Sequence, residues 1–481
     1  MKNKRFDLES LKRSNLGEKT MKIYNTLTKQ KEEFIPREDK KVRMFVCGPT
    51  VYDYIHIGNA RTFVFFDVVV KYLRHIGYEV QYIQNITDIE DKIIARAKET
   101  GDDPLAFAKK YEEKFLEDMK SLGVTAVTDY NHYARASDHI PEVVKQVKTL
   151  IAKGHAYLIE GDCYYFDLST FSDYGKLSGR TAAMADDAVS RIDENPNKRN
   201  RGDFALWKFS KEGEPSWETE LGKGRPGWHI EDTAITEKYF GPQYDLHGGG
   251  QDLIFPHHEA EIAQQESASG LKPFVKYWMH TGFLVSKEKK MSKSLGNFLS
   301  LNEALKNYSL ETLRFYFLSA HYRSPLDFSE EILKQSEAAV MRINEFRNKL
   351  NLLTSQVTNI DDEEIGKAFQ KIKEAMDDDF NTPEAIGAFF ELIRQTNQKL
   401  ENRQIATAEL IKIIDFFEKV LGIVPEPITY PAKIRELIDQ REKMREAKDF
   451  AAADQLRSQI ESLGYQIDDT IYGPLVKKKT G

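Results

Sequence analysis

The chain has 481 residues, of which 41% are hydrophobic, with a mean hydropathy of −0.54 and a formal net charge of −7. This length exceeds a single hydrophobic core, so several domains of a soluble globular protein are expected. The acidic balance, with a pI near 6.0, argues against a protein that coats DNA. The acidic balance does not exclude RNA binding, because proteins recognise RNA by its shape and through local basic patches.

No stretch of the sequence has the run of apolar residues that a membrane-spanning helix requires. The densest apolar stretch, residues 62–73, is interrupted by Asp67 and Lys71 and is predicted to be a buried helix. Residues 1–20 are charged and lack the apolar centre of a secretory signal, so we expect an N-terminal extension. Met21 is a second plausible start.

Two cysteines, Cys47 and Cys163, are too few for a disulfide framework. Free thiols are typical of the reducing cytoplasm, which is the expected location. Cys163 lies in a strand-like run and is expected to be a packing residue rather than a nucleophile.

The first part of the chain shows a strand–helix–strand pattern. Residues 42–47 are a short apolar run that predicts a strand, and Gly48-Pro49-Thr50 ends it. Helical spacing of apolar residues begins near Gly58, and residues 79–86 predict a second strand. Such a βαβ unit implies a parallel sheet and an α/β fold of Rossmann type.

The sheet pattern is then interrupted and resumes. Residues 142–218 are predicted to be an insertion, with a polar loop at 196–202. The strand pattern returns at 244–247 and runs into Gly248-Gly249-Gly250. Pro256 is predicted to open the next helix, at a position where proline is tolerated.

From about residue 331 the pattern becomes helical. Apolar residues recur at three- and four-residue spacing to about residue 423, which predicts amphipathic helices. A proline-rich segment, 425–431, marks a linker. Residues 433–463 predict a helical hairpin, which is followed by a small tail with three consecutive lysines at 477–479.

The string His56-Ile57-Gly58-Asn59 lies between the first predicted strand and its helix. Backbone amides and the helix dipole make a helix start a site for phosphate. Gly58 allows a ligand to approach the backbone, and His56 and Asn59 can donate hydrogen bonds to phosphate oxygens. Taken alone, a four-residue string is better explained as an ordinary strand-to-helix turn.

A second string, Lys290-Met291-Ser292-Lys293-Ser294, follows Lys289 and places three lysines on one short loop. Lysines so close together repel one another unless they meet an anion. The alternative is a solvated charged loop, which most lysine runs are. Because the string follows the βαβ pattern and the first string is present, we interpret the two as a grip on the phosphates of ATP.

Gly249, Gly250 and Asp252 add a third element at a predicted strand end, where ligands bind in open α/β sheets. Small residues make room for a nucleotide, and the carboxylate suits ribose hydroxyls. By itself this string is weak, and a simple glycine turn is the alternative.

A candidate metal site begins at the next predicted helix. His257 and Glu261 are four residues apart, so both project from one face and could ligate one metal ion. Cys47, at the end of the first strand, could add a thiolate across the sheet. Without Cys47, a polar helix start with capping carboxylates would be the better explanation.

Six strings together resemble those of the cysteinyl-tRNA synthetases, which are class I aminoacyl-tRNA synthetases, from about Met21 to nearly the end of the chain. They are Cys47-Gly48-Pro49-Thr50-Val51-Tyr52-Asp53, Asn85-Ile86-Thr87-Asp88-Ile89-Glu90-Asp91-Lys92, Gly224-Arg225-Pro226-Gly227-Trp228-His229-Ile230-Glu231, residues 247–261, residues 290–294 and Met376-Asp377-Asp378-Asp379-Phe380-Asn381-Thr382-Pro383.

The resemblance implies a Rossmann-type parallel-sheet catalytic domain with an insertion, an all-α bundle and a small anticodon-binding domain. The expected parts are the extension (1–20), the first half of the catalytic domain (21–141), the connective insertion (142–218), the second half of the catalytic domain (219–275), a stem-contact region that contains the 290–294 string (276–330), the helical bundle (331–425) and the C-terminal anticodon-binding domain (426–481).

In this family, two cysteines, a histidine and a glutamate hold a zinc ion, which receives the thiol of substrate cysteine. By motif position Cys47, His257 and Glu261 match three ligands, and Asp232 stands where the second cysteine would be. We expect one zinc ion per chain, bound through these four residues and more weakly than with two thiolates, because a carboxylate oxygen is a harder donor. The alternative is a metal-free site in which shape alone selects the substrate.

The resemblance further implies an amino-acid pocket that contains Cys47, Thr87, Trp228 and His229. In the implied reaction, the carboxylate of cysteine attacks the α-phosphorus of ATP. The resulting cysteinyl-adenylate is transferred to the 3′-terminal adenosine of tRNA(Cys).

The resemblance implies different roles for the string at 56–59 and the string at 290–294. His56 and Asn59 would contact the triphosphate, with Mg²⁺ accompanying ATP. Lys290 and Lys293 would stabilise charge on the departing pyrophosphate, and Lys293 is expected to contribute more.

The C-terminal part resembles the anticodon-reading end of the family in residues 441–450, although a charged helical hairpin without a ligand is the alternative. Many relatives have a tryptophan near the end that could stack on a base, where this chain has Val476. A monomer is expected, with no DNA or membrane partner.

Two other functions remain possible from the sequence. One is an ATP-dependent ligase that joins cysteine to an amino sugar, but such relatives lack the anticodon-reading end. The other is a non-catalytic paralogue that binds tRNA or a protein, which Asp232 favours and the three nucleotide-binding strings disfavour.

Overall fold

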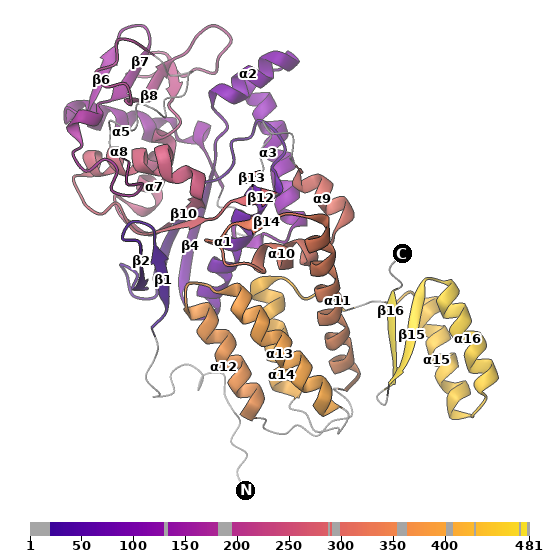
Figure 1. The fold of residues 1–481 in the computed structure, drawn as a ribbon. Coiled ribbons are helices and arrows are strands. Elements are labelled where there is room, and N and C mark those ends of the chain that lie inside the picture. Colours follow the sequence, from indigo (N-terminus) through magenta and orange to yellow (C-terminus); the bar gives the residue numbers. More distant parts are fainter. Residues whose placement is uncertain are drawn as a thin grey trace.

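The computed structural model describes residues 20–128, 133–180, 195–286, 289–290, 299–353, 363–400, 407–427, 430–470 and 473–478. Figure 1 shows a central sheet with the insertion above it, a helical bundle below it and a C-terminal domain beside the bundle. Within the described ranges, no helix is both long and apolar enough to cross a membrane. Most of the predicted extension, residues 1–19, lies outside these ranges.

The central sheet has five parallel strands in the order β11-β10-β3-β4-β5. They are β3 (Lys41–Val46), β4 (Glu79–Ile86), β5 (Tyr133–Arg135), β10 (Tyr244–Gly250) and β11 (Val275–Thr281). Helix α1 (Ile57–His75) connects β3 to β4, which confirms the predicted βαβ unit and the α/β fold.

Helix α1 is buried along almost its whole length, as its apolar sequence predicts. The two charged residues that interrupt this sequence form an ion pair, with Lys71 Nζ 2.8 Å from Asp67 Oδ2. Asp67 also pairs with Arg314 of α10 (Leu310–Leu318), whose guanidinium lies 2.8 Å away. The buried charges therefore attach α1 to the helices below the sheet.

A four-stranded antiparallel sheet lies beside α5 (Ile140–Ala152); three of its strands come from the predicted insertion (142–218) and the fourth follows it in the sequence. Its strands are β6 (Ala156–Ile159), β7 (Cys163–Phe166), β8 (Phe204–Phe209) and β9 (Gly224–Pro226). Cys163 is buried in a small cluster with Tyr157, Tyr165 and Ala205, so the prediction of a packing residue is confirmed.

Helix α8 (Glu259–Ser269) follows two short turns, η5 (Gln251–Leu253) and η6 (Ile254–His258). Phe255 is the only residue of η6 with non-helical backbone angles, so helical backbone runs from Pro256 into α8, as predicted. Phe255 is extended, with φ −142° and ψ 131°, because the residue before a proline is sterically disfavoured in the α region.

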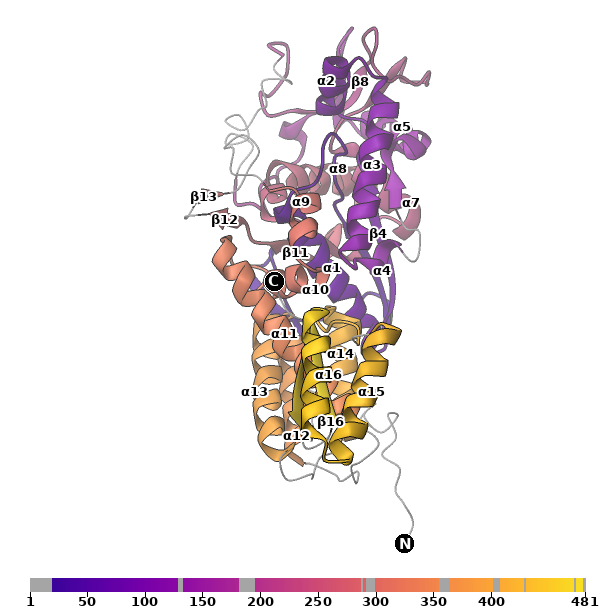
Figure 2. The ribbon, with the colours of Figure 1, turned by 90° about the vertical axis from the view of Figure 1, so that its right-hand side faces the viewer.

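The remaining elements frame the sheet and form the bundle, which Figure 2 shows with α11 to α14 packed together. They are β1 (Lys22–Asn25), β2 (Gln30–Glu33), α2 (Asp91–Thr100), α3 (Pro104–Ser121), α4 (Thr125–Thr128), η1 (Ala136–His139), η2 (Leu168–Thr170), α7 (Ile230–Phe240), β12 (Leu284–Ser286), β13 (Lys289–Lys290), α9 (Leu301–Asn307), β14 (Leu326–Asp327), α11 (Glu330–Leu353), α12 (Glu363–Asp377), α13 (Thr382–Leu400), α14 (Thr407–Phe416) and η8 (Phe417–Leu421).

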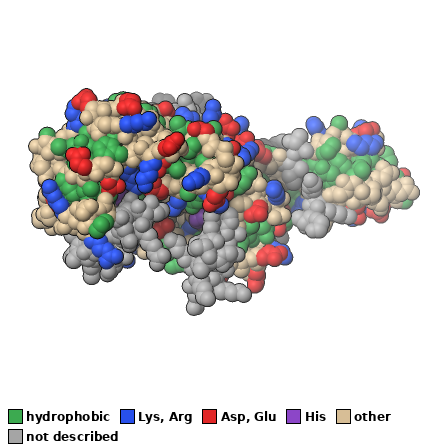
Figure 3. All heavy atoms as spheres, turned by 90° about the horizontal axis from the view of Figure 1, so that it is seen from above, with side chains coloured by type: hydrophobic (Ala, Val, Ile, Leu, Met, Phe, Trp, Pro, Cys, Tyr) green, Lys and Arg blue, Asp and Glu red, His purple; other side chains and the backbone are tan. Residues whose placement is uncertain are grey.

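The C-terminal domain projects from the body of the molecule, as the view from above shows (Figure 3). The predicted helical hairpin is α15 (Ala432–Glu446) and α16 (Phe450–Ser462). The tail adds a β-hairpin, β15 (Tyr465–Thr470) and β16 (Gly473–Lys478). Val476 is buried in β16 in the apolar cluster of this domain, so its side chain is not available to stack on a base.

Candidate functional site

The predicted site residues collect at the carboxyl edge of the central sheet. Cys47 follows β3, Thr87 follows β4, and Gly250 ends β10. These three strands are neighbours, and the amide of Cys47 donates a hydrogen bond to the carbonyl of Gly248, at 3.0 Å. Residues from distant parts of the sequence, such as Cys47 and Gly250, thus share one edge, where open α/β sheets bind ligands.

The first phosphate-binding string caps α1. His56 is the N-cap residue, and its Nδ1 accepts a hydrogen bond from the amide of Asn59 at 3.2 Å. A Cβ atom on Gly58 would lie 2.7 Å from the imidazole of His56. The ring can therefore keep this position only if residue 58 is glycine. The string therefore presents a helix start with its ring held in place, as an anion site would require.

The second string lies mostly outside the described residues, but its two flanks are placed. Residues 291–298, including Lys293, are not described, and Lys290 is described only as backbone in β13. On the far flank, the amide of Leu301 donates to the carbonyl of Ile55 at 3.0 Å, and that of Ile57 donates to Leu299 at 3.2 Å.

On the near flank, Leu284 of β12 lies 3.7 Å from the position of a Cβ on Gly58. The chain on both sides of the second string therefore lies against the first string.

Arg61, which the sequence reasoning did not single out, also joins these two regions. Its guanidinium donates to the carbonyl of Gly282 at 2.9 Å and to that of Ser324 at 2.8 Å. Burial lowers its pKa to about 10, so the group stays charged at neutral pH. An arginine within an apolar helix, two residues after the first string, was the signal available in the sequence.

The third string occupies the end of the neighbouring strand. Gly249 and Gly250 are the last residues of β10, and Asp252 is exposed in the following turn, η5. They lie on the same sheet edge as Cys47, since β10 pairs with β3.

The structure brings together the four residues that the sequence predicts as metal ligands. Asp232 Oδ2 lies 3.3 Å from Cys47 Sγ and 2.9 Å from His257 Nε2. Glu261 Oε1 lies 3.9 Å from Cys47 Sγ and 3.2 Å from His257 Nε2. All four side chains are buried, and one donor atom from each lies within 4.8 Å of the other three.

These distances fit a four-coordinate ion. Zinc bonds of about 2.0 Å to nitrogen or oxygen and about 2.3 Å to sulfur, at tetrahedral angles, separate the donor atoms by roughly 3.3–3.5 Å. The second oxygen of Glu261, Oε2, is buried and has no hydrogen-bond partner among the described residues. The chemistry of the donors and this unsatisfied oxygen both fit a bound divalent cation.

An overlapping set shares Cys47 and Glu261 but uses His247 and His258. Their Nε2 atoms lie 3.4 and 3.1 Å from Cys47 Sγ, respectively. His258 Nε2, however, is 4.0 Å from Glu261 Oε1. In the set that contains Asp232, His257 Nε2 lies 3.2 Å from Glu261 Oε1, nearer the distance that tetrahedral zinc requires. We therefore take this set as the candidate metal site.

The electrostatics also point to a cation. Burial, and then the carboxylates of Asp232 and Glu261, raise the pKa of the Cys47 thiol well above its ordinary value. Burial and Asp232 likewise raise the pKa of Glu261. A divalent ion among these groups would reverse both effects, because metal binding favours the deprotonated ligand.

Of the four predicted pocket residues, Cys47 belongs to this cluster and the other three lie beside it. Trp228 is 37% exposed, and its ring stacks on that of His257 with centroids 4.5 Å apart. His229 Nδ1 lies 2.7 Å from His257 Nδ1. Thr87 is buried, and its hydroxyl donates to a carboxylate oxygen of Glu231. Trp228 is therefore the pocket residue most open to solvent.

Two family models match the chain. Residues 33–338 match the model described as tRNA synthetases class I (C) catalytic domain. The chain belongs to this family. Residues 371–425 match the DALR domain, which lies in the helical bundle.

Curated relatives of this family extend over nearly the whole chain. A cysteine–tRNA ligase of Heliobacterium modesticaldum is 44% identical over 95% of this chain and 100% of its own length. A cysteine–tRNA ligase of Thermococcus onnurineus is 43% identical over 95% of this chain and 99% of its own length. The class I synthetase fold is also that of methionyl-tRNA synthetase from Mycobacterium tuberculosis, bound by methionyl-adenylate, with a TM-score of 0.59 at 14% identity over 79% of this chain and 92% of that one.

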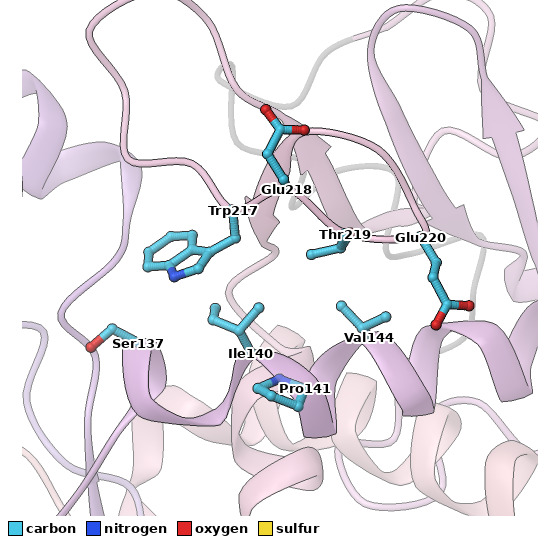
Figure 4. Close-up of a pocket in the computed structure, with 8 residues that line it drawn as sticks. All are labelled: Ser137, Ile140, Pro141, Val144, Trp217, Glu218, Thr219 and Glu220. Carbon is cyan, nitrogen blue, oxygen red and sulfur yellow. The ribbon is translucent and has the colours of Figure 1, made fainter.

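One open groove lies elsewhere on this synthetase. It runs between α5 and the loop at 217–220, and Figure 4 shows Trp217 and Ile140 facing each other across it. None of the predicted site residues lines it.

Proposed function

We propose that this chain is a cysteine–tRNA ligase, which activates L-cysteine with ATP and transfers it to the 3′-terminal adenosine of tRNA(Cys). One observation carries the proposal. The buried cluster of Cys47, Asp232, His257 and Glu261 lies on the same sheet edge as the His56–Asn59 string. A group that selects a thiol and a group that binds a triphosphate thus lie at one edge, as adenylation of cysteine requires.

We infer that the metal is zinc, held by these four residues. When bound, zinc would supply a coordination position that takes a thiolate in preference to an alcohol. Cysteine and serine differ by one atom, and a pocket built on size alone separates such near-isosteres poorly. The ring of Trp228, stacked on His257, would then form an apolar wall beside the substrate side chain.

Formation of the adenylate depends mainly on positioning of the reactants and stabilisation of charge. The positive end of the α1 dipole and the side chains of His56 and Asn59 bind and orient the triphosphate, which carries Mg²⁺. Gly249, Gly250 and Asp252 at the end of β10 hold the nucleoside. Lys290 and Lys293 stabilise the departing pyrophosphate, since both flanks of their loop lie against the first string.

We assign tRNA binding to the helical bundle (331–425) and the C-terminal domain (426–481), following the division of the chain expected from its sequence. The relatives that carry the name cysteine–tRNA ligase align with about 95% of this chain, which supports a full synthetase rather than a shortened relative. We further propose a cytoplasmic monomer that binds neither DNA nor membranes.

The function is tested by cysteine-dependent ATP–pyrophosphate exchange, with serine as the control amino acid and zinc measured in the same sample. We expect about one zinc per chain, exchange with cysteine and very little with serine. Full cysteine activation with only a few hundredths of an equivalent of zinc would end the metal proposal and leave the ligase proposal standing. Absence of exchange in zinc-loaded protein would contradict the ligase itself.

Lys293→Ala tests the phosphate-binding loop. We expect adenylate formation to slow by roughly 100-fold or more, because a charge-stabilising donor is lost in the transition state. Binding of cysteine should change little. Pre-steady-state adenylate formation measures the first effect and calorimetry the second, with Lys306→Ala, an exposed lysine of α9, as the matched control. An unimpaired exchange rate would contradict the assigned role.

A further inference from the structure

Asp232 divides its two carboxylate oxygens between different partners. Oδ1 accepts a hydrogen bond from Asn85 Nδ2 at 2.6 Å. Oδ2 faces the other proposed ligands, 3.3 Å from Cys47 Sγ and 2.9 Å from His257 Nε2. Because Asp232 is only 1% exposed, water does not compete for either oxygen. One oxygen is therefore turned toward the metal position and the other is held by an amide.

Asn85 is itself fixed on both sides. It lies in β4, is 2% exposed, and its Oδ1 accepts a hydrogen bond from the amide of Gly48 at 2.6 Å. Its Nδ2 also lies 3.3 Å from Thr87 Oγ1. A Cβ on Gly48 would be 1.8 Å from the carbonyl oxygen of Asn85, so glycine is needed for this close approach. The Asn85 amide thus cannot turn away from Asp232 without losing the hydrogen bond from Gly48.

This arrangement matters because aspartate and cysteine differ in the number of donor atoms that they offer to a metal ion. A thiolate offers one donor atom, whereas a carboxylate offers two oxygens that can both bind one ion. Binding through both oxygens would fill the position that a substrate thiol needs in a zinc site with three or four protein ligands. Residues that hydrogen-bond a ligand commonly fix its orientation in this way.

We propose that Asn85 is a positioning residue that restricts Asp232 to one metal-binding oxygen, and so allows an aspartate to serve as the fourth ligand. This inference rests on the proposed metal site. It concerns a residue whose side chain supports a ligand without touching the ion. Its effect should therefore depend on which residue stands at position 232.

The test is a double-mutant comparison of metal affinity, with Asn85→Ala, Asp232→Cys and both together. Zinc affinity is measured by competition with a chromophoric chelator, and geometry by the visible absorption of the Co²⁺-substituted protein. Asn85→Ala is expected to weaken zinc binding about 10–100-fold and to weaken the intense bands of four-coordinate Co²⁺. In the Asp232→Cys background, Asn85→Ala should lower zinc affinity by less than about 3-fold, since a cysteine has no second oxygen that could bind the ion.

An equal loss in both backgrounds would overturn the inference, because Asn85 would then act through Gly48 and Cys47. No loss in either background would overturn it as well. If Asn85→Ala does not fold, the spectra of the wild type and Asp232→Cys decide: both should be four-coordinate, and a five- or six-coordinate wild type refutes the proposal. A wild type that binds no zinc would instead contradict the proposed metal site.

Discussion

Cys47→Ser is expected to reduce zinc affinity by more than about 100-fold, and with it the activation of cysteine. A serine hydroxyl keeps its proton at neutral pH and replaces the soft sulfur donor among Asp232, His257 and Glu261. Glu261, whose pKa burial already raises, would then lose the ion that keeps it deprotonated. Zinc content by metal analysis and cysteine-dependent ATP–pyrophosphate exchange measure the two effects.

The chain offers a matched control in its other cysteine. Cys163→Ser makes the same chemical change in the insertion sheet, where the thiol packs with aromatic residues. It should cost some stability but leave zinc content and exchange near the wild-type values. Full zinc loading in Cys47→Ser would show that this thiolate is not a ligand.

Discrimination against serine gives a second readout of the same substitution. If the metal selects the thiol, the ratio of kcat/KM for cysteine over serine should fall in Cys47→Ser toward the roughly 100-fold that shape alone provides. A ratio that stays at the wild-type value, in protein shown to lack zinc, would assign the selection to the pocket walls, among them Trp228 and Thr87.

Much of the fold follows from local patterns in the sequence. The apolar run at 42–47 and the helical spacing from Gly58 predict the βαβ unit, because buried strands and helices differ in the period of their apolar residues. Pro256 was predictable as the point where helical backbone begins, because proline is tolerated at a helix start and disfavours helical angles at the preceding Phe255. The β-hairpin at 465–478 lacks a simple alternating pattern and was expected only as a tail.

The candidate site was predictable where residue type and spacing carry the chemistry. Cys47, His257 and Glu261 could be grouped from spacing and strand position, and the place of Asp232 came from the family motif. Asn85 and Arg61 were not predicted to act, because their roles depend on partners 147 and 221 positions away. Such contacts are set by tertiary packing, which a single sequence does not report.

Arg314 also contacts residues that are distant in the sequence, and Arg314→Met is expected to lower the stability of the protein strongly. The guanidinium of Arg314 is fully buried, lies 2.8 Å from Asp67 and donates to the carbonyls of Leu421 and Gly123 at 2.7 and 3.1 Å. Its removal leaves a buried carboxylate on α1 and two carbonyls without this donor. We expect a loss of about 3–5 kcal/mol in the free energy of unfolding, measured by urea denaturation followed by circular dichroism.

The pH dependence identifies the cause of that loss. Burial alone would raise the pKa of Asp67, but Arg314 and Lys71 lower it below its ordinary value. A carboxyl whose pKa is lower in the folded state stabilises the protein above its unfolded pKa of about 3.9, and this stabilisation is lost as the pH falls through the folded value. The difference between wild type and Arg314→Met should therefore be large at neutral pH and shrink as the pH falls below about 4. Asp67→Asn added to Arg314→Met should recover part of the loss at pH 7, since Lys71 would otherwise be the one remaining cation, among the described residues, beside the buried carboxylate. A double variant no more stable than Arg314→Met would instead attribute the loss to the hydrogen bonds that Arg314 donates to the carbonyls of Leu421 and Gly123.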